Sequence, residues 1–305
     1  MPPTNEPRPT KAVRRDEARL KAAQMRKEQE RKAKRNRYIA IGALVIAVLA
    51  LVFIVWKIMS EQKTNESANS DVVYGNGASD LVPHVLADVS APKPANDTGG
   101  IPVSGDGGDD VGVVGDGDVV VQIYFDFMCP VCGQFEQING ADVASLLKDG
   151  GTTIEYRPIS FLDSKSSGTF YSTRAANAAA VVADQAPEHF AEFVSQMYVD
   201  QPAEGSAGRT DAEIAKIASD LGVSKSVTDA FTKTVNGSYE TGTAASPTSH
   251  TGTWRTFAPW VMGATNQMQT DLGSIGTPTI IIDGKKFENW STPGALLAAV
   301  KAAQS

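Results

Sequence analysis

The stretch Val119-Val-Val-Gln-Ile-Tyr-Phe-Asp-Phe-Met-Cys-Pro-Val-Cys132 decides the fold. Its first seven residues are nearly all β-branched or aromatic, and a strand that is apolar on both faces suits the middle of a covered sheet. Pro130 comes soon after, and proline is favoured in the first turn of a helix because its missing N–H would be unpaired there anyway. We therefore predict a strand that leads into a helix over residues 130–148, with Cys129 and Cys132 at the helix start.

Further strand signals lie on both sides of this stretch. Residues 152–158 read as a second strand, and the order strand, helix, strand predicts parallel pairing with a right-handed crossover. Residues 111–114 are predicted to form a hairpin with the first strand around Gly115-Asp-Gly-Asp118. Near the C-terminus, residues 278–282 form an apolar strand, Asp283-Gly284 a hairpin turn, 285–288 an edge strand and 293–303 a helix.

A helical region separates these two groups of strands. Apolar residues repeat at i, i+3, i+4 and i+7 from Phe190 and from Ile214, which is typical of amphipathic helices. Residues 175–182 form a helix of small side chains, 257–272 form another helix, and the Gly/Ser/Thr-rich residues 241–253 are predicted to be a loop. The whole is an α/β fold with a helical insertion at about 163–273.

Residues 38–56 contain no charged side chain. At about 1.5 Å per residue a helix of this length spans roughly 28 Å, close to the hydrocarbon thickness of a bilayer. Tyr38 and Trp56 flank it, as is usual at membrane interfaces. The alternatives are a buried core helix and a cleaved signal peptide, but the stretch is long and no small-residue cleavage site follows it. We predict a retained signal-anchor, with the transmembrane helix at 38–59.

Charge is distributed very unevenly along the chain. Residues 1–37 carry 13 Lys/Arg against 5 Asp/Glu, whereas the remainder carries 15 against 30. The positive-inside rule keeps the basic tail 1–37 in the cytoplasm and places the rest outside, in the cell envelope. Residues 60–110 are rich in Asn, Ser, Asp, Gly and Pro and are predicted to be a flexible linker to a domain at 111–305. A folded part this acidic argues against nucleic-acid binding.

The chain has two cysteines, Cys129 and Cys132, and three scattered histidines. This composition excludes a disulfide scaffold and a four-thiolate zinc site within one chain. A Cys-x-x-Cys pair at a helix start has a redox mechanism, because unpaired N–H groups and the helix dipole favour the first thiolate and the second sulfur can resolve a mixed disulfide. A zinc half-site shared by two chains and an inert structural disulfide are the alternatives.

Two motifs, residues 126–132 (Asp-Phe-Met-Cys-Pro-Val-Cys) and 276–284 (Gly-Thr-Pro-Thr-Ile-Ile-Ile-Asp-Gly), resemble the DsbA-like branch of the thioredoxin superfamily. The similarity covers about residues 105–303. It implies a thioredoxin fold with a helical insertion domain, here preceded by a single transmembrane helix, and thiol–disulfide oxidoreductase activity. It also implies a redox-active Cys129–Cys132 disulfide with no separate cofactor or metal. Further support for the active site would come from Pro130 and Val131, and from a cis Thr277–Pro278 peptide that offers backbone hydrogen bonds to substrate.

The sequence departs from the family pattern at two positions. Ile123 stands where thioredoxins place a buried carboxylate, and Val131 stands where strongly oxidising relatives carry histidine. Fewer contacts to the thiolate should leave this disulfide less oxidising. Asp126, three residues before Cys129, is a candidate for proton handling, and the alternative is a carboxylate at the helix start or in solvent.

The resemblance leads to a functional hypothesis: a membrane-tethered oxidase that introduces disulfides into exported proteins with thiols and is reoxidised by a quinone-linked membrane partner. The first alternative is electron flow in the opposite direction, which would make the protein a membrane-tethered disulfide reductase. The second is a non-catalytic anchored binding module that keeps the thioredoxin fold.

Overall fold

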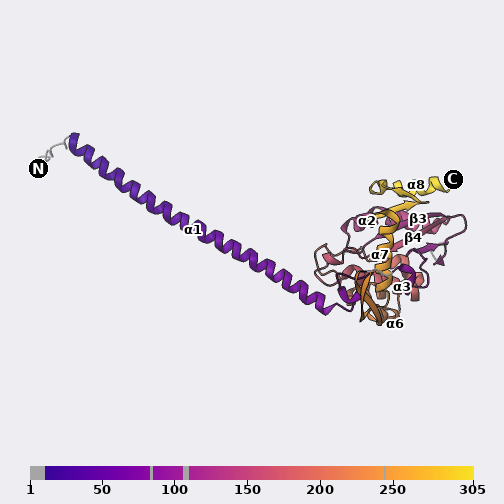
Figure 1. The fold of residues 1–305 in the computed structure, drawn as a ribbon. Helices are drawn as coiled ribbons and strands as arrows, with labels where there is room; N and C mark the ends of the chain where they lie inside the picture. The colour runs from indigo at the N-terminus through magenta and orange to yellow at the C-terminus, as the bar shows by residue number, and fades with distance from the viewer. Residues whose placement is uncertain (1–10, 83–84, 106–109, 244) are drawn as a thin grey trace. The chain divides into compact units, whose positions relative to one another are not determined.

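The computed structural model of the chain describes residues 11–82, 85–105, 110–243 and 245–305. It divides into two compact units, one ending at Ser60 and one running from Glu61 to Ser305. The helix α1 (Lys11–Ala68) is drawn as one uninterrupted helix in Figure 1. It contains a stretch long and apolar enough to cross a membrane, which fits a single-pass anchor.

A six-stranded mixed sheet forms the centre of the second unit, in the order β2-β1-β4-β3-β7-β8. Neighbouring strands are antiparallel except β3 and β4, which are parallel. The predicted strand–helix–strand unit and the hairpin around Asp283-Gly284 are confirmed. The strands are β1 (Ile101–Ser104), β2 (Asp110–Val111), β3 (Val119–Phe125), β4 (Thr152–Pro158), β7 (Thr279–Ile282) and β8 (Lys285–Phe287).

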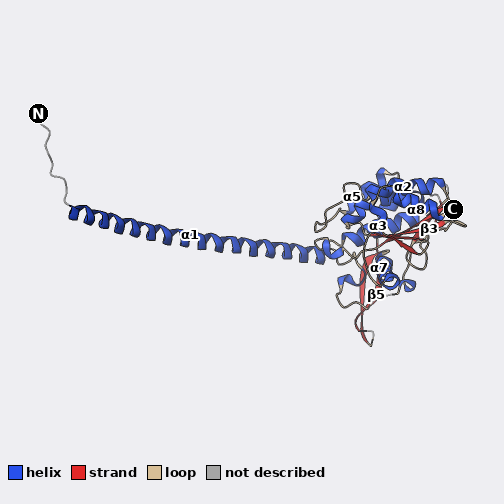
Figure 2. Ribbon diagram, turned by 90° about the horizontal axis from the view of Figure 1, so that it is seen from above, coloured by secondary structure: helices blue, strands red, loops and turns tan. Residues whose placement is uncertain are grey.

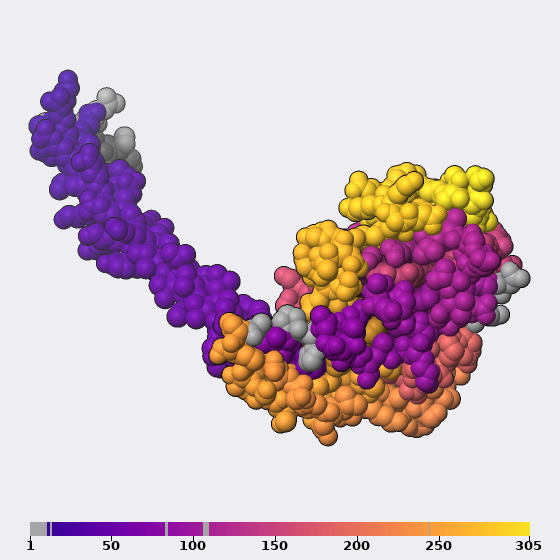
Figure 3. All heavy atoms as spheres, turned by 45° about the vertical axis from the view of Figure 1, so that its right-hand side comes forward, coloured from indigo at the N-terminus to yellow at the C-terminus, as the bar shows by residue number. Residues whose placement is uncertain are grey.

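Helices cover both faces of this sheet. In Figure 1, α8 lies above β3 and α3 lies below β4. The helix α2 packs against β4 and α8, and α7 packs against β4 and α3. The C-terminal residues cover one side of the unit in the space-filling view of Figure 3. The α-helices are α2 (Pro130–Asp149), α3 (Tyr171–Gln185), α4 (Phe190–Gln196), α5 (Asp211–Asp220), α6 (Lys225–Thr228), α7 (Ala258–Leu272) and α8 (Ala295–Ala303). Short 3-10 turns are η1 (Tyr74–Gly77), η2 (Leu86–Asp88), η3 (Asp163–Lys165), η4 (Pro187–His189), η5 (Asp229–Thr232) and η6 (Asn289–Ser291).

The helix α3 lies at the centre of the helical region between β4 and β7. Thirteen of its fifteen residues are buried, and most of them are alanine or another small residue. Small side chains let neighbouring helices approach closely, so the prediction of a tightly packed helix over 175–182 is confirmed. The helices predicted at 130–148 and 257–272 are also confirmed.

The flexible linker predicted over residues 60–110 is wrong for much of its described part. Val72 and Ile101 are 0% exposed, and β1 pairs with β4 in the central sheet. The average composition of this stretch is polar, but several of its apolar side chains, among them Val72, Leu86 and Ile101, are buried. The described part of the segment therefore belongs to the domain.

The hairpin predicted between residues 111–114 and 119–125 is also wrong. β2 pairs with β1, while β3 lies between β4 and β7. A turn sequence indicates only that the chain reverses, and here β4 and β7 occupy both edges of β3.

Residues 241–253, predicted to be a loop, form most of a hairpin instead. β5 (Thr234–Thr243) and β6 (Ser246–Arg255) pair antiparallel over ten residues each. Figure 2 shows this hairpin projecting from the rest of the second unit. Threonine favours strands, but this stretch also contains many glycines and serines, which are typical of loops and led to the loop prediction.

Candidate active site

The two cysteines lie at the junction between β3 and α2. Cys129 is the residue that precedes the first turn of α2, and Pro130 occupies the first helical position, as predicted. The backbone N–H groups of Cys132 and Gly133 donate to the Cys129 carbonyl oxygen at 3.1 and 3.3 Å. Both cysteines are free thiols, 5% exposed at Cys129 and 2% at Cys132. The more accessible sulfur is therefore the one at the helix start.

The pKa values of the two thiols are shifted in opposite directions. The pKa of Cys129 falls from 9.0 to about 6, chiefly because the Cys132 side chain is hydrogen-bonded to it, with further help from Thr277 and from the first backbone N–H groups of α2. Burial raises the pKa of Cys132 well above its usual value. At neutral pH the pair therefore holds one thiolate, on Cys129, and one thiol.

The segment before β7 completes the site from the other end of the chain. The peptide between Thr277 and Pro278 is cis, as the family resemblance implied. The Cys129 sulfur lies 3.3 Å from the Thr277 carbonyl oxygen, to which it donates a hydrogen bond when it is protonated. Pro130 and Val131, both exposed, form the rim beside Cys129. The structure thus brings all six of the predicted cysteine, rim and cis-proline residues to one place.

Asp126 is completely buried, which rules out the solvent-carboxylate alternative. Its oxygens accept hydrogen bonds from the Met128 N–H (2.8 Å), the Ser172 hydroxyl (2.6 Å) and the Leu162 N–H (3.0 Å). Burial raises the pKa of Asp126 to about 7, more than these three donors lower it. The carboxylate ties the active-site loop to the segment that follows β4 and to α3, and its protonation changes near neutral pH.

Gln201 is a site residue that sequence reasoning missed. Its side-chain amide donates to the carbonyl oxygens of Phe127 and Cys129, both at 2.9 Å. A side chain on Gly133 would collide with the Gln201 amide oxygen, so the glycine after Cys132 makes this contact possible. No local motif marks Gln201, because it lies in the helical insertion and only the fold brings it to the cysteines.

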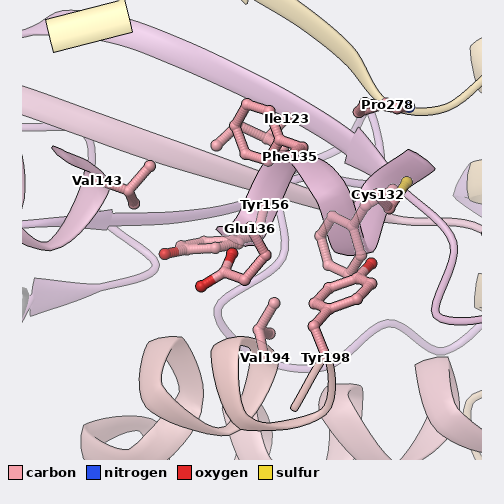
Figure 4. A pocket seen from close by; sticks show the side chains of 10 residues that line it. Ile123, Cys132, Phe135, Glu136, Val143, Tyr156, Val194, Tyr198 and Pro278 are labelled. Atoms are coloured by element: carbon pink, nitrogen blue, oxygen red, sulfur yellow. The ribbon is translucent and has the colours of Figure 1, made fainter. Parts of the chain in front are cut away.

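A second missed residue is Glu136, one turn beyond Cys132 on α2. It lines a small cavity of about 20 Å³ together with Cys132, Tyr156 and Tyr198 (Figure 4). A cavity of that size has room for one water molecule. Burial raises the pKa of Glu136, and the Ser195 hydroxyl donates to its carboxylate at 2.5 Å. The buried sulfur thus has a carboxyl group on the same cavity wall.

Within the described ranges, no group of three or more His, Cys, Asp or Glu side chains is placed to hold a metal ion. What the residues at this site can do by themselves is form, accept and resolve disulfides, since an acidic thiol stands beside a buried one.

Comparison with known proteins gives one family match and several relatives. A family model described as Thioredoxin matches residues 113–302. The chain is 30% identical over 182 residues to the serine/threonine-protein kinase PknE of Mycobacterium tuberculosis. That match covers 58% of this chain and 28% of the kinase, so the chain spans little more than a quarter of the length of the curated relatives it matches.

Solved structures with the same fold include two from Mycobacterium tuberculosis. Its reduced DsbA is 28% identical, with a TM-score of 0.50 over 67% of this chain and 91% of that one. Its reduced disulfide bond oxidoreductase DsbG is 27% identical, with a TM-score of 0.50 over 68% and 88% of the two chains. The thiol-disulfide oxidoreductase MdbA of Actinomyces oris is 21% identical, with a TM-score of 0.52 over 72% and 99%, which is a likeness of fold.

Proposed function

The chain belongs to the thioredoxin family and has the fold of DsbA-like thiol–disulfide oxidoreductases, and from this premise we propose that it oxidises exported proteins through Cys129 and Cys132. The observation that carries the proposal is the pairing of an acidic thiol at a helix start with a buried, weakly acidic one. No prosthetic group is needed, because the disulfide itself accepts the two electrons.

The reaction begins with the oxidised Cys129–Cys132 disulfide. A client thiolate attacks the Cys129 sulfur, a mixed disulfide forms, and Cys132 leaves and takes up a proton. A second client thiolate then attacks the client sulfur of the mixed disulfide, and Cys129 leaves as a thiolate. The client loses two electrons and gains a disulfide, and the enzyme gains both electrons as a thiol and a thiolate. A low pKa makes Cys129 a good leaving group, which favours this oxidising direction.

Three neighbours support the reaction in this proposal. The Thr277 carbonyl and the cis Pro278 lie against the reacting sulfurs, where an extended client backbone can also bind. Glu136, with its raised pKa, supplies the proton that the departing Cys132 sulfur takes up across the small cavity. Asp126 positions the loop that carries Cys129 through its hydrogen bond to the Met128 N–H.

We further propose that α1 anchors the domain on the outer face of the membrane. Residues 38–56 would span the bilayer, the basic tail would remain in the cytoplasm, and the domain would meet exported proteins with thiols. The reduced pair would be reoxidised by a quinone-linked partner in the same membrane, as the family resemblance suggests.

Thiol trapping on intact cells tests the proposal. An oxidase should be found mostly as the Cys129–Cys132 disulfide, whereas a reductase should be found mostly as the dithiol. Cys132→Ala should accumulate mixed disulfides with exported clients, and Cys129→Ser should accumulate none. A resting dithiol would overturn the oxidase direction, and function retained by Cys129→Ser would indicate a non-catalytic binding module.

A further inference from the structure

A surface groove runs between α2 and α4 and ends beside the active site. It consists of two adjoining hollows of about 380 and 430 Å³, which share Glu136, Gly140 and Ser195. Glu136 of α2 and Val194 of α4, both labelled in Figure 4, line the groove and also the small cavity beside Cys132. We call it the α2–α4 groove. The other residues that line it include Ala141, Ala144 and Leu147 on α2, Ala191 and Glu192 on α4, and Val199 and Asp200 beyond α4.

The groove exists because α2 carries small residues on the side that faces α4. Gly140 lies in the interior of a 20-residue helix, where glycine costs about 1 kcal/mol relative to alanine. Ala141 follows it directly and Ala144 lies one turn further along, and Ala191 lines the groove from α4. Larger side chains at these places would fill the space. The small residues of α2 therefore leave the α2–α4 groove open, although Gly140 lowers the stability of the helix.

The groove is also uniformly acidic. Its lining residues include Glu136, Glu192 and Asp200 but no Lys, Arg or His, and the latter two acids are exposed at its rim. The nearest basic residue along α2 is Lys148, one turn beyond Ala144. An apolar floor with an acidic rim complements a chain that carries both aliphatic and basic side chains.

The groove is continuous with the active site. Val199 is 54% exposed and lines the groove next to Asp200. The following residue, Gln201, holds the Cys129 carbonyl oxygen at 2.9 Å. A polypeptide whose cysteine reacts at Cys129 can therefore run directly into the groove.

We propose that the α2–α4 groove binds an extended segment of the client polypeptide that carries Lys or Arg within several residues of the reacting cysteine. This proposal rests on the proposed function and adds a substrate class to it: clients with basic residues near their thiols are oxidised faster. Exposed charge pairs of this kind change affinity by about 2- to 5-fold each. The two rim acids together predict a preference of about 4- to 25-fold for basic over acidic peptides.

The test compares two dithiol peptides that are identical except for Lys or Glu on both sides of the first cysteine. The full-length protein in a detergent with uncharged headgroups oxidises each peptide, and kcat/KM is measured. The variant Glu192→Lys/Asp200→Lys should lose or reverse the preference. The control Asp97→Lys/Asp116→Lys carries the same added charge on exposed acids away from the groove and should retain it. Oxidation of dithiothreitol should be equal in all three proteins.

Failure of this proposal is distinguishable from failure of the proposed function. Equal kcat/KM for the two peptides in the wild type, or an unchanged preference in the groove variant, overturns the groove proposal while oxidase activity stands. If the wild type oxidises neither peptide nor dithiothreitol, oxidase activity fails instead. In that case the groove proposal is tested separately, by measuring with fluorescence anisotropy how each peptide binds when its cysteines are replaced by serine. Tighter binding of the Lys peptide that is lost in Glu192→Lys/Asp200→Lys supports the groove proposal. Equal binding of the two peptides overturns it.

Discussion

The hydrogen bond from Cys132 is the largest cause of the low pKa of Cys129, so removing the Cys132 thiol should raise that pKa. Cys132→Ala takes away the donor and leaves the backbone in place. Cys132→Ser keeps a hydroxyl donor of similar size at the same position. We expect the pKa of Cys129 to rise clearly in the alanine variant and to change little in the serine variant.

The size of the effect follows from the site. The fall in pKa from 9.0 to about 6 corresponds to about 4 kcal/mol in favour of the thiolate. Cys129 is 5% exposed, so solvent screens this interaction only weakly. A hydrogen bond to a charged group contributes about 1.5–3 kcal/mol, or about one to two pKa units. The backbone N–H groups of Val131 and Cys132 remain, so the pKa of Cys129 in Cys132→Ala should lie between about 7 and 8.

The thiolate can be followed directly by its absorbance at 240 nm from pH 4 to 10, with Cys129→Ser as the blank. At pH 7 the wild type should be about 90% thiolate, and the alanine variant about half or less. A pKa at or below 6 in Cys132→Ala would refute the reasoning, because the helix start would then suffice by itself. Equal pKa values in the alanine and serine variants would refute the role of the hydrogen bond.

Three further predictions concern the redox potential and the buried carboxyl groups. Lowering the pKa of Cys129 to about 6 makes the disulfide more oxidising by only about 30 mV at pH 7. The reduction potential, measured by equilibration with glutathione, should therefore lie well below the −120 mV or so of the strongest oxidant in this family. Burial raises the pKa of Glu136, and only its protonated carboxyl group can donate a proton, so Glu136→Gln should slow reduction of the disulfide by a client peptide several-fold at the acidic end of the pH range and progressively less as the pH rises. A ratio of the two rates that does not change with pH would contradict proton donation. Asp126 has a folded pKa of about 7 against 3.8 unfolded, so its contribution to stability is complete below pH 4 and is lost as pH rises through 7. Urea unfolding at pH 5 and pH 8 should therefore show a smaller difference in stability in Asp126→Asn than in the wild type.

The parts of the fold that could be predicted from sequence are those where local signals agree. The residues of β3 are apolar on both faces, Pro130 fixes the start of α2, and Asp283-Gly284 sets the β7–β8 turn. Each of these features is decided by a few neighbouring residues. The redox pair belongs to the same class, because the chemistry of Cys129 and Cys132 depends on their spacing and on the helix start.

The parts that could not be predicted depend on contacts between distant segments. Composition made residues 60–110 look like a linker, but Ile101 pairs opposite Tyr156 in the central sheet. Gln201 reaches the Cys129 carbonyl from 72 residues away, and no pattern in the helical insertion marks it. A side chain whose role is set by one long-range hydrogen bond leaves no periodic signal in the sequence.

The substitution of the usual buried carboxylate by Ile123 shows why such contacts decide the chemistry. Ile123 lines the small cavity next to Cys132, and by itself it would leave the buried sulfur without a proton donor. The same cavity contains Glu136, whose carboxylate Ser195 of α4 holds in place. In the proposed mechanism the departing Cys132 sulfur needs an acid on the wall of this cavity, and α2 supplies it through Glu136 where the strand carries Ile123. Because Ser195 of α4 holds Glu136 by a hydrogen bond, the proposed mechanism makes the helical insertion part of the active site. Substitutions at Ser195 should therefore alter the pH dependence of the reaction without changing either cysteine.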